Sequence, residues 1–340
     1  MVDKTALFWK KVGKEKAVQC QLCPHYCIIG NGEAGKCRAR QNVNGKLISL
    51  VYGKPVSVAI DPIEKKPLYH FLPGEKTFSF GTVGCNLKCL NCQNAGISQA
   101  SPENFKIKAI NPTEIVKEAL KNKTKIISYT YTEPTVFYEY VLDISKIAKN
   151  QKKDGMKNVI VSNGFINEKP LKEWCKIIDG ANIDLKSISE DFYERICEGK
   201  LNPVLETIKT LRKKKIWVEI TNLVIPGVND SLYDIRKLIS WVIENIGVDV
   251  PLHFSAFYPC YKMDYKQPTD PELLKKARKI AMEQGLRYVY TGNILDDEGN
   301  NTYCPRCKKA VIIRHGFEII SNKIKDGKCS CGEKIAGVWE

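Results

Sequence analysis

The sequence lacks any apolar run long enough to cross a bilayer, so we expect no membrane-spanning segment. Its start, MVDKTALFWKK, has no apolar stretch behind the first charged residues, so we expect no signal peptide either. Both absences predict a cytoplasmic protein that does not use a membrane as a partner.

Nothing in the bulk composition departs from that of a globular chain. The 340 residues are 43% hydrophobic and 27% charged, enough for one large domain with small appendages. The net charge of +15 is concentrated at both ends of the chain. A basic surface suits an acidic partner, a phosphorylated substrate or nucleic acid, and a solvated lysine-rich face is an equal alternative.

Cysteine, by contrast, is abundant, with 14 residues. Because structural disulfides are not expected in a reducing cytosol, metal or redox chemistry is the leading explanation. Most of the cysteines fall into three groups, at 20–37, 85–92 and 304–331. Cys175, Cys197 and Cys260 stand alone, and we interpret them as small core residues.

The middle of the chain alternates short β-rich runs with helix-like segments. The expected strands are 77–83, 126–131, 158–162, 181–185, 216–223 and 252–257. The expected helices are 113–121, 136–152, 169–178, 203–214, 231–245 and 275–285. This alternation predicts an α/β fold with a parallel sheet. Six units are fewer than the eight of a closed barrel, so we predict an open, partial (β/α)6 barrel of the TIM type, with the chemistry at the carboxyl ends of the strands.

Three regions follow from these patterns. Residues 77–299 form the predicted catalytic barrel. Residues 1–76 hold the first cysteine group and a lead-in, and residues 300–340 hold the last group with strand-like runs at 311–314 and 318–320. The predicted plan is therefore a barrel with a small cysteine-bearing module at each end.

The central cysteines, Cys85, Cys89 and Cys92, form a C-x3-C-x2-C run directly after a predicted strand. Each thiolate can bind one iron of a [4Fe–4S] cluster, and the fourth iron then stays open, because no fourth cysteine is nearby in the sequence. The alternatives are a zinc site that lacks a ligand, or three unrelated thiols, but zinc sites usually combine C-x2-C pairs and four ligands. We predict an open, redox-active cluster as the catalytic centre.

This run resembles the radical S-adenosylmethionine (radical SAM) superfamily, whose signature is C-x3-C-x-aromatic-C at the end of the first barrel strand. The resemblance implies SAM as the ligand of the open iron. Asn91 stands where the superfamily has an aromatic residue, so any contact of that residue with the adenine must be made differently here.

Polar residues at later strand ends match SAM-binding positions by the same resemblance. Thr132 and Glu133 stand where the superfamily has its Gly-Gly-Glu motif, which implies a site for the methionine ammonium. Both glycines of that motif are replaced here. Ser162 and Asn163 end the next strand, where short polar side chains suit ribose hydroxyls.

The remaining matches lie further along the chain. Asp184 and Lys186 resemble the Asp-x-Lys that glycyl-radical-activating members use around cofactor and substrate. Ile225 and Gly227 belong to a stretch that resembles the motif whose backbone lies along the adenine. His253 lies in the last predicted strand and is either a satisfied core residue or part of the cofactor pocket.

Over nearly the whole chain the sequence is similar to the AmmeMemoRadiSam-system radical SAM enzymes, in the branch that resembles pyruvate formate-lyase-activating enzyme. The similarity rests on DPIEKKPLYHFLPG, on the cysteine run and on an N-terminal Cys-x2-Cys-Pro element. It implies Memo-like and AMMECR1-like proteins as partners and leaves the substrate open.

The two terminal cysteine groups each offer four thiols. Cys304, Cys307, Cys329 and Cys331 resemble a zinc ribbon, in which zinc contributes to folding, although the last pair has one intervening residue instead of two. The N-terminal group can hold zinc or a second iron–sulfur cluster, and zinc is our prediction; its members are Cys20, Cys23, Cys27 and Cys37. His25 is a further possible ligand, although we expect it at the surface.

The leading functional hypothesis is an oxidoreductase that works anaerobically. An electron from a donor such as ferredoxin or flavodoxin enters the cluster and cleaves SAM to methionine and a 5′-deoxyadenosyl radical. That radical abstracts hydrogen from a small molecule or a peptide. The alternatives are an activating enzyme that makes a glycyl radical on a partner protein, and a zinc-stapled nucleic-acid-binding protein. We do not expect nucleic acid to be a partner of the enzyme.

Overall fold

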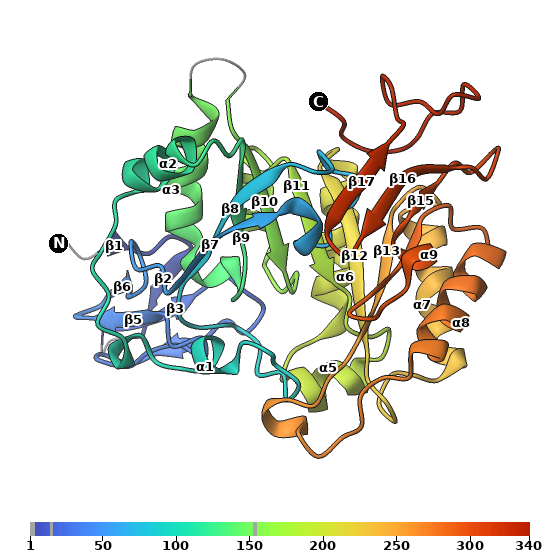
Figure 1. Ribbon diagram of the computed structural model, residues 1–340. Coiled ribbons are helices and arrows are strands. Elements are labelled where there is room, and N and C mark those ends of the chain that lie inside the picture. Colours follow the sequence, from blue (N-terminus) through green and yellow to red (C-terminus); the bar gives the residue numbers. More distant parts are fainter. Residues whose placement is uncertain (1–3, 14–15, 152–154) are drawn as a thin grey trace.

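An eight-stranded sheet forms the centre of this computed structural model, which describes residues 4–13, 16–151 and 155–340 (Figure 1). The strands are β7 (Ser57–Pro62), β8 (Lys76–Gly81), β9 (Ile126–Tyr129), β10 (Lys157–Ser162), β11 (Gly180–Asp184), β12 (Trp217–Val224), β13 (Leu252–Ala256) and β14 (Val289–Gly292). They lie side by side in sequence order, from β7 at one edge to β14 at the other. Strands β8 to β14 are parallel, and β7 is antiparallel to β8. The sheet is therefore an open partial barrel, as predicted.

Helices connect the parallel strands and pack on the sheet. They are α2 (Pro112–Lys121), α3 (Tyr138–Lys149), α4 (Glu168–Trp174), α5 (Glu190–Cys197), α6 (Leu201–Lys213), α7 (Leu232–Asn245) and α8 (Pro271–Glu283). Asn111 and Glu114 form a capping box at α2, and the side chains of Ser231 and Asp270 accept backbone N–H groups at the starts of α7 and α8. The buried residues of α7 repeat with helical spacing: Ile235, Leu238, Ile239 and Val242.

The six predicted strands coincide with β8 to β13, each end within two residues. The predicted helix 136–152 consists of a 3-10 turn, η3 (Pro134–Phe137), followed by α3, and its predicted end at residue 152 lies outside the described residues. Strands β7 and β14 and helix α5 were not predicted. β7 ends in a proline and β14 has only four residues, so neither carries a long alternating pattern.

Two small sheets precede the barrel. One contains β1 (Lys4–Thr5), β6 (Lys46–Ser49) and β5 (Arg40–Val43), and the other contains β2 (Trp9–Val12), β3 (Ala17–Cys20) and β4 (Ile28–Ile29). A buried ion pair between Arg40 and Glu139 joins them to α3, and Arg40 also donates to the carbonyl of Leu7 at 2.9 Å. Val18 and Leu47 belong to the same hydrophobic core as the barrel. The N-terminal region therefore packs as part of one body with the barrel.

The C-terminal region forms a third small sheet of β15 (Thr302–Tyr303), β16 (Ala310–His315) and β17 (Glu318–Asn322), which confirms both predicted strand-like runs. Arg314 is fully buried and donates to the Tyr69 carbonyl at 2.8 Å and to the Thr302 hydroxyl at 2.9 Å. Its Nε lies 3.7 Å from a carboxylate oxygen of the buried Glu64. This cation therefore fastens the end of the chain to the segment that precedes β8.

The predicted regions 1–76, 77–299 and 300–340 stay predictions, although the sheet itself is wider than the predicted barrel. Strand β7 joins the sheet from within the predicted N-terminal region. A bridge between Phe71 and Val338 pairs the N-terminal lead-in with the last residues of the chain.

Replacing Arg314 with methionine tests the buried contact between the C-terminal region and the barrel. The variant leaves the Glu64 carboxylate buried without its cation, so we expect the free energy of unfolding to fall by about 3–5 kcal/mol. Chemical denaturation followed by circular dichroism measures this change. Arg195→Ala is the matched control, because Arg195 pairs with Asp191 at the surface and should change stability little. Equal losses in both variants would contradict the role of Arg314.

Because His70 is buried in its neutral form, we expect the stability of the fold to depend on pH. Burial lowers the pKa of His70 to about 4, and its neutral ring is satisfied by Ala336 O at 2.6 Å and the Tyr290 hydroxyl at 2.5 Å. Between pH 6.5 and 4 the unfolded chain binds a proton that the folded chain does not, so stability falls as the pH falls through this window. The loss from this residue is about 3 kcal/mol, and it should be absent in His70→Gln. Denaturation at a series of pH values compares the two proteins, with the exposed His315→Gln as the control that keeps the wild-type slope.

Candidate functional site

The ends of four neighbouring parallel strands bring most of the predicted site residues together. The cysteine loop follows β8, Glu133 follows β9, Asn163 follows β10, and Asp184 ends β11. Parallel pairing of β8 with β9, β9 with β10 and β10 with β11 places these ends at one edge of the sheet. This is the edge at which parallel α/β folds carry their chemistry.

The cysteine loop is held in place by hydrogen bonds to two other segments. The backbone N–H of Lys88 donates to Cys197 O at 2.8 Å, and that of Leu90 donates to Ile196 O at 3.0 Å. Cys85 Sγ accepts from the Leu87 N–H at 3.4 Å and lies 3.7 Å from the side-chain amide nitrogen of Asn163. N–H donors directed at a sulfur atom stabilise a thiolate and tune a bound cluster.

The pKa values of two of these thiols are shifted in opposite directions. Burial raises the pKa of Cys85 well above its usual value, and the nearby Glu133 carboxylate raises it further. A hydrogen bond from the Cys197 thiol, in contrast, lowers the pKa of Cys89. A metal supplies the positive charge that deprotonates such thiols.

The spacing of the sulfur atoms fits a cluster better than a single ion. Among the residues that the structure describes, one set of cysteines alone brings its ligand atoms within 4.8 Å of one another, and it is at the C-terminus. Cys85, Cys89 and Cys92 do not form so tight a set. In an iron–sulfur cluster each thiolate binds a different iron, so a wider spacing is expected there. The three cysteines therefore fit the predicted cluster.

Glu133 is the best-connected carboxylate at this edge. It is buried and accepts hydrogen bonds from the N–H and hydroxyl of Thr135, at 3.0 and 2.6 Å, from the Ser162 hydroxyl at 2.8 Å and from the Asn163 N–H at 2.8 Å. Burial raises its pKa, and these donors act in the opposite direction. Thr132 is turned away from this carboxylate, because its hydroxyl donates to the Thr82 carbonyl at 2.8 Å.

Asp184 and Lys186 form an ion pair of 2.8 Å at the end of β11. Burial opposes the charge of Lys186, but Asp184 and the Cys89 thiol hold its pKa well above the usual value. Lys186 therefore stays a cation beside the cysteine loop. Two asparagines that were not predicted as site residues fix its backbone: Asn222 and Asn229 donate to the Lys186 carbonyl at 3.1 and 2.7 Å.

The turn after β12 is hydrogen-bonded, through Asn229, to the backbone of Lys186. The Ile225 N–H donates to the side-chain oxygen of Asn229 at 2.6 Å, and Gly227 has a φ of +67°, which favours glycine. Lys266 donates to the Pro226 carbonyl at 3.0 Å. Gly227 and Lys266 line a surface cleft with Leu90 from the cysteine loop. Asn229 thus connects the predicted adenine-binding turn to Lys186.

His253 is a satisfied interior residue. Its Nε2 lies 2.7 Å from the Glu219 carboxylate, and its ring stacks on Tyr290. Glu219 also accepts the N–H groups of Tyr69 and His70, at 2.9 and 2.7 Å. Of the two alternatives for His253, these contacts favour the core residue.

Asn91 is buried, and its backbone carbonyl accepts from the Cys260 thiol at 3.4 Å. Its side-chain oxygen is shielded from solvent and has no hydrogen-bond partner within the described ranges of the chain. The position at which the radical SAM signature has an aromatic residue is therefore occupied here by a buried amide whose oxygen has no hydrogen-bond partner in the described residues.

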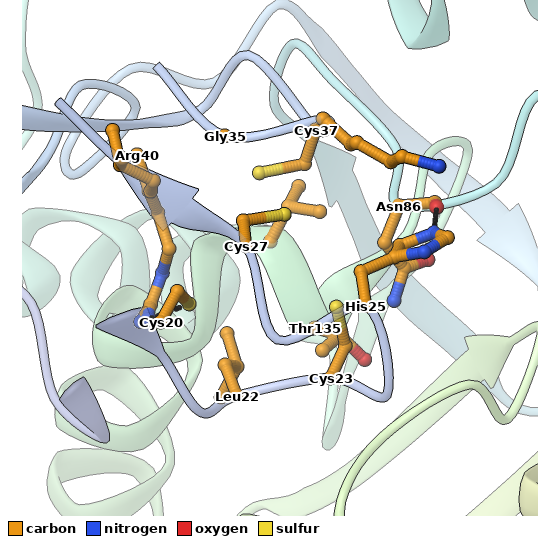
Figure 2. Close-up of a pocket in the computed structure, with 13 residues that line it drawn as sticks. Cys20, Leu22, Cys23, His25, Cys27, Gly35, Cys37, Arg40, Asn86 and Thr135 are labelled. Atoms are coloured by element: carbon orange, nitrogen blue, oxygen red, sulfur yellow. Dashed lines mark hydrogen bonds between the residues drawn. The ribbon is translucent and has the colours of Figure 1, made fainter. Parts of the chain in front are cut away.

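The N-terminal cysteines surround a separate cavity beside this site (Figure 2). Cys20, Cys23, Cys27 and Cys37 all line it, and Figure 2 shows the thiols of Cys23, Cys27 and Cys37 pointing into the space between them. His25 is half-buried rather than exposed, and its Nε2 lies 2.7 Å from the Asn86 carbonyl, next to Cys85.

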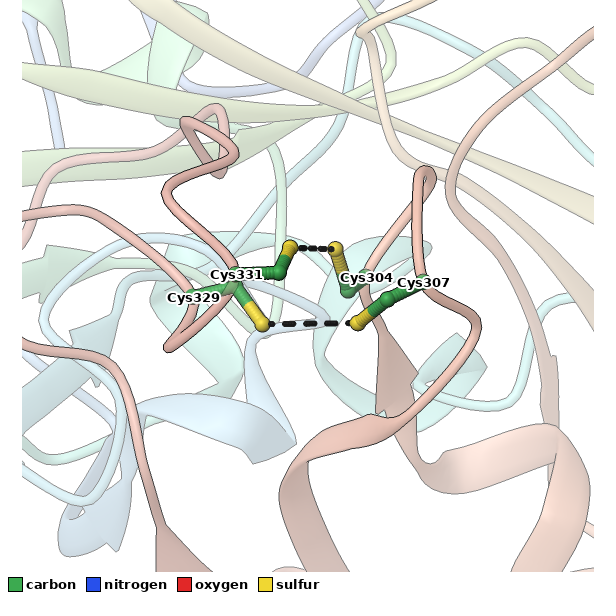
Figure 3. A group of neighbouring side chains, drawn as sticks. All are labelled: Cys304, Cys307, Cys329 and Cys331. Atoms are coloured by element: carbon green, nitrogen blue, oxygen red, sulfur yellow. Dashed lines mark hydrogen bonds between the residues drawn. The ribbon is translucent and has the colours of Figure 1, made fainter.

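The C-terminal cysteines form a compact set (Figure 3). Cys304 Sγ lies 3.6 Å from Cys331 Sγ, and Cys307 Sγ lies 3.7 Å from Cys329 Sγ. All four sulfur atoms lie within 4.8 Å of one another, so this set can hold a single metal ion. The short spacing of the last pair does not prevent the four thiols from meeting.

Three comparisons relate this chain to known proteins. The Radical SAM superfamily profile matches residues 80–239. An uncharacterized protein of Methanocaldococcus jannaschii is 46% identical over 335 residues, 98% of each chain. The pyruvate formate-lyase-activating enzyme of Clostridium pasteurianum is 26% identical over 231 residues, which cover 63% of this chain and 91% of that enzyme.

Two solved structures share the fold. Streptococcus suis SuiB bound to its precursor peptide has a TM-score of 0.50 and 15% identity, over 68% of this chain and 51% of SuiB. A radical SAM methyltransferase from Sphaerobacter thermophilus has a TM-score of 0.50 and 12% identity, over 65% of this chain and 67% of that protein. In the described part of this chain, none of the helices combines the length and apolar character that a membrane span requires.

Proposed function

Because this chain is an enzyme of the radical SAM superfamily, we propose that it cleaves SAM reductively and directs the resulting radical at a small molecule or a peptide. The observation that supports this most directly is the position of Asn163. Its backbone N–H binds Glu133 at 2.8 Å, and its side chain lies 3.7 Å from Cys85 Sγ. One residue thus joins the carboxylate proposed for the methionine ammonium to the cysteine loop.

When a [4Fe–4S] cluster and SAM are bound, the cluster supplies the electron that splits SAM into methionine and a 5′-deoxyadenosyl radical. Cys85, Cys89 and Cys92 would hold the cluster. The Glu133 carboxylate keeps lone-pair capacity on the oxygen that accepts only the Asn163 N–H, and it can receive the ammonium there.

The other residues at this edge position and shield the reactants. Ser162 and Asn163 lie next to Glu133, and we propose that they bind the ribose. Asp184 and Lys186 form a polar pair beside Cys89 that can orient cofactor or substrate. Ile225 and Gly227 would lie along the adenine. His253 has no role in this proposal, because Glu219 already satisfies it.

Variants of Cys89 and Glu133 test the proposed reaction. Reconstituted protein reduced with dithionite should form 5′-deoxyadenosine from SAM, and Cys89→Ala should form none. Glu133→Gln should keep its iron but bind SAM roughly tenfold to a hundredfold more weakly, because a charged hydrogen bond is lost. Chromatography of the products and equilibrium binding of SAM measure the two effects.

Cys175→Ala is the control for these variants, because Cys175 lies at the end of α4, outside the site. It should match the wild-type protein in both measurements. A Cys89→Ala variant that forms 5′-deoxyadenosine at the wild-type rate would overturn the proposal.

A glycyl-radical activating role is the second candidate, and the similarity to pyruvate formate-lyase-activating enzymes favours it. In that case a partner protein incubated with reduced enzyme and SAM would show the EPR doublet of a glycyl radical. The N- and C-terminal regions, which add two further cysteine sets to the barrel, favour the small-molecule or peptide substrate instead.

We also propose an electron donor of the ferredoxin or flavodoxin class, and Memo-like and AMMECR1-like proteins as partners in the cytoplasm. The exposed Lys36 and the overall charge of +15 suit an acidic donor protein. An oxygen-sensitive cluster requires that these partners be tested anaerobically.

For the C-terminal set we propose zinc in a structural role. A tetrahedral zinc with four thiolates places its sulfur atoms about 3.8 Å apart, which the Cys304–Cys331 and Cys307–Cys329 distances of 3.6 and 3.7 Å approach. Four thiolates leave no open position for a substrate.

Removing two of these ligands tests the zinc site. Cys307→Ser combined with Cys331→Ser should lose one zinc per chain and lower the melting temperature, because zinc binding contributes to folding. Metal analysis and thermal denaturation measure the two effects, with Cys175→Ser as the control. Unchanged zinc content in the double variant would exclude zinc from this set.

A further inference from the structure

We propose that Cys20, Cys23, Cys27 and Cys37 hold a second [4Fe–4S] cluster next to the cluster at Cys85, Cys89 and Cys92, in place of the zinc that the sequence predicted.

The first support is the spacing of the four sulfur atoms. A zinc ion would draw them together as tightly as the C-terminal set, in which every pair of ligand atoms lies within 4.8 Å. In the described part of the chain the N-terminal cysteines do not form such a set, and neither do the three cysteines of the radical SAM loop. The N-terminal set thus shares its open spacing with the proposed cluster site and not with the zinc-like site.

The second support is the space between the thiols. All four cysteines of the N-terminal set line this space. Its remaining wall is largely apolar, with contributions from Leu22, Ile29 and Val136. A four-iron cluster is held by its thiolates and needs little from the rest of the wall, which an apolar lining fits.

The third support is an unpaired cation near both cysteine sets. Lys88 Nζ is shielded from solvent and has no hydrogen-bond partner among residues 4–13, 16–151 and 155–340. It lies within electrostatic reach of the cation Arg38, of Cys85 and Cys37 from the two cysteine sets, and of the Glu198 carboxylate. An ammonium without a partner is costly away from water, so this position calls for anionic neighbours. Glu198 supplies one such charge, and thiolate-bound clusters at the two cysteine sets would supply more, which would also offset the nearby Arg38.

A hydrogen bond to one of the proposed cluster ligands also supports the second cluster. Arg40 donates to Cys20 Sγ at 3.5 Å. A cationic donor of this kind stabilises a thiolate and tunes the potential of a bound cluster.

The two sites share a wall, which gives the second cluster a role that rests on the proposed function. Asn86 lines the N-terminal cavity and is adjacent to Cys85 in the chain, and Thr135 lines the same cavity while it donates to Glu133. Lys36 at the rim is exposed, so a donor protein can approach from outside. The cluster held by Cys20, Cys23, Cys27 and Cys37 would accept one electron from the donor and would pass it to the cluster held by Cys85, Cys89 and Cys92, so that the first cluster would return to its oxidised state.

Metal analysis of the unmodified, anaerobically reconstituted chain is the first test. We expect about eight irons and about one zinc per chain, from two four-iron clusters and the C-terminal set. EPR of the dithionite-reduced protein should show two clusters, only one of which changes its signal when SAM is added. About four irons with two zincs would overturn the second cluster, and this test requires no variant to fold.

Variants separate this inference from the proposed function. Cys23→Ala combined with Cys27→Ala should lose about half of the iron and keep the SAM-sensitive signal, whereas Cys89→Ala should lose the other half. Cys175→Ala should retain all of it. If the first variant keeps all of its iron, the second cluster is wrong. If Cys89→Ala loses none, the proposed function fails instead.

The choice of reductant tests the electron path. In the Cys23→Ala, Cys27→Ala variant, 5′-deoxyadenosine formation driven by dithionite should persist, because this small reductant can reach the remaining cluster directly. Formation driven by reduced flavodoxin should be lost. Equal loss with both reductants, or no loss with flavodoxin, would overturn the role as an electron relay.

Discussion

The buried carboxylate of Glu133 is the contact on which the geometry of the site depends. It receives hydrogen bonds from Thr135 in the turn after β9 and from Ser162 and Asn163 at the end of β10. A carboxylate can remain ionised away from water only where such donors converge on it. The same convergence fixes Asn163, whose side chain reaches Cys85. Two strand ends and the cysteine loop are thus positioned by one negative charge.

A second buried carboxylate, Glu219, performs a structural task deeper in the barrel. It binds His253 from the neighbouring strand and the backbone of Tyr69 and His70 from the lead-in segment. Arg314 approaches the same segment from the C-terminal sheet. The lead-in therefore lies between the barrel and the C-terminal region and is hydrogen-bonded to both. Satisfied polar networks of this kind are costly to break one partner at a time, which favours a single fixed arrangement.

The sequence was sufficient for the barrel, because its strands and helices depend on local patterns, while the site residues stay predictions that the structure brings to one edge of the sheet. The six predicted strands follow from alternation and Cys85 from the cysteine spacing, whereas Glu133 and Asn163 were named through the resemblance to the radical SAM superfamily. What it did not predict depends on distant contacts. The core position of His253 became clear only from its contact with Glu219. The role of Asn229 became clear only from its hydrogen bond to the Lys186 carbonyl, 43 residues earlier in the chain. Such pairs leave no periodic signal in one sequence.

The two terminal cysteine groups show the same limit most clearly. Each has four cysteines; the sequence predicts zinc for the C-terminal group from its ribbon-like spacing, and for the N-terminal group it prefers zinc to a second iron–sulfur cluster. The number of thiols fixes how much charge a site can neutralise, but the distance between them decides whether one ion or a cluster can bind all four. The C-terminal sulfur atoms meet closely, whereas the N-terminal ones face a cavity that also borders Asn86 and Thr135. The backbone around each set, and not its cysteine count, thus decides how closely the four thiols approach one another and which other residues they face.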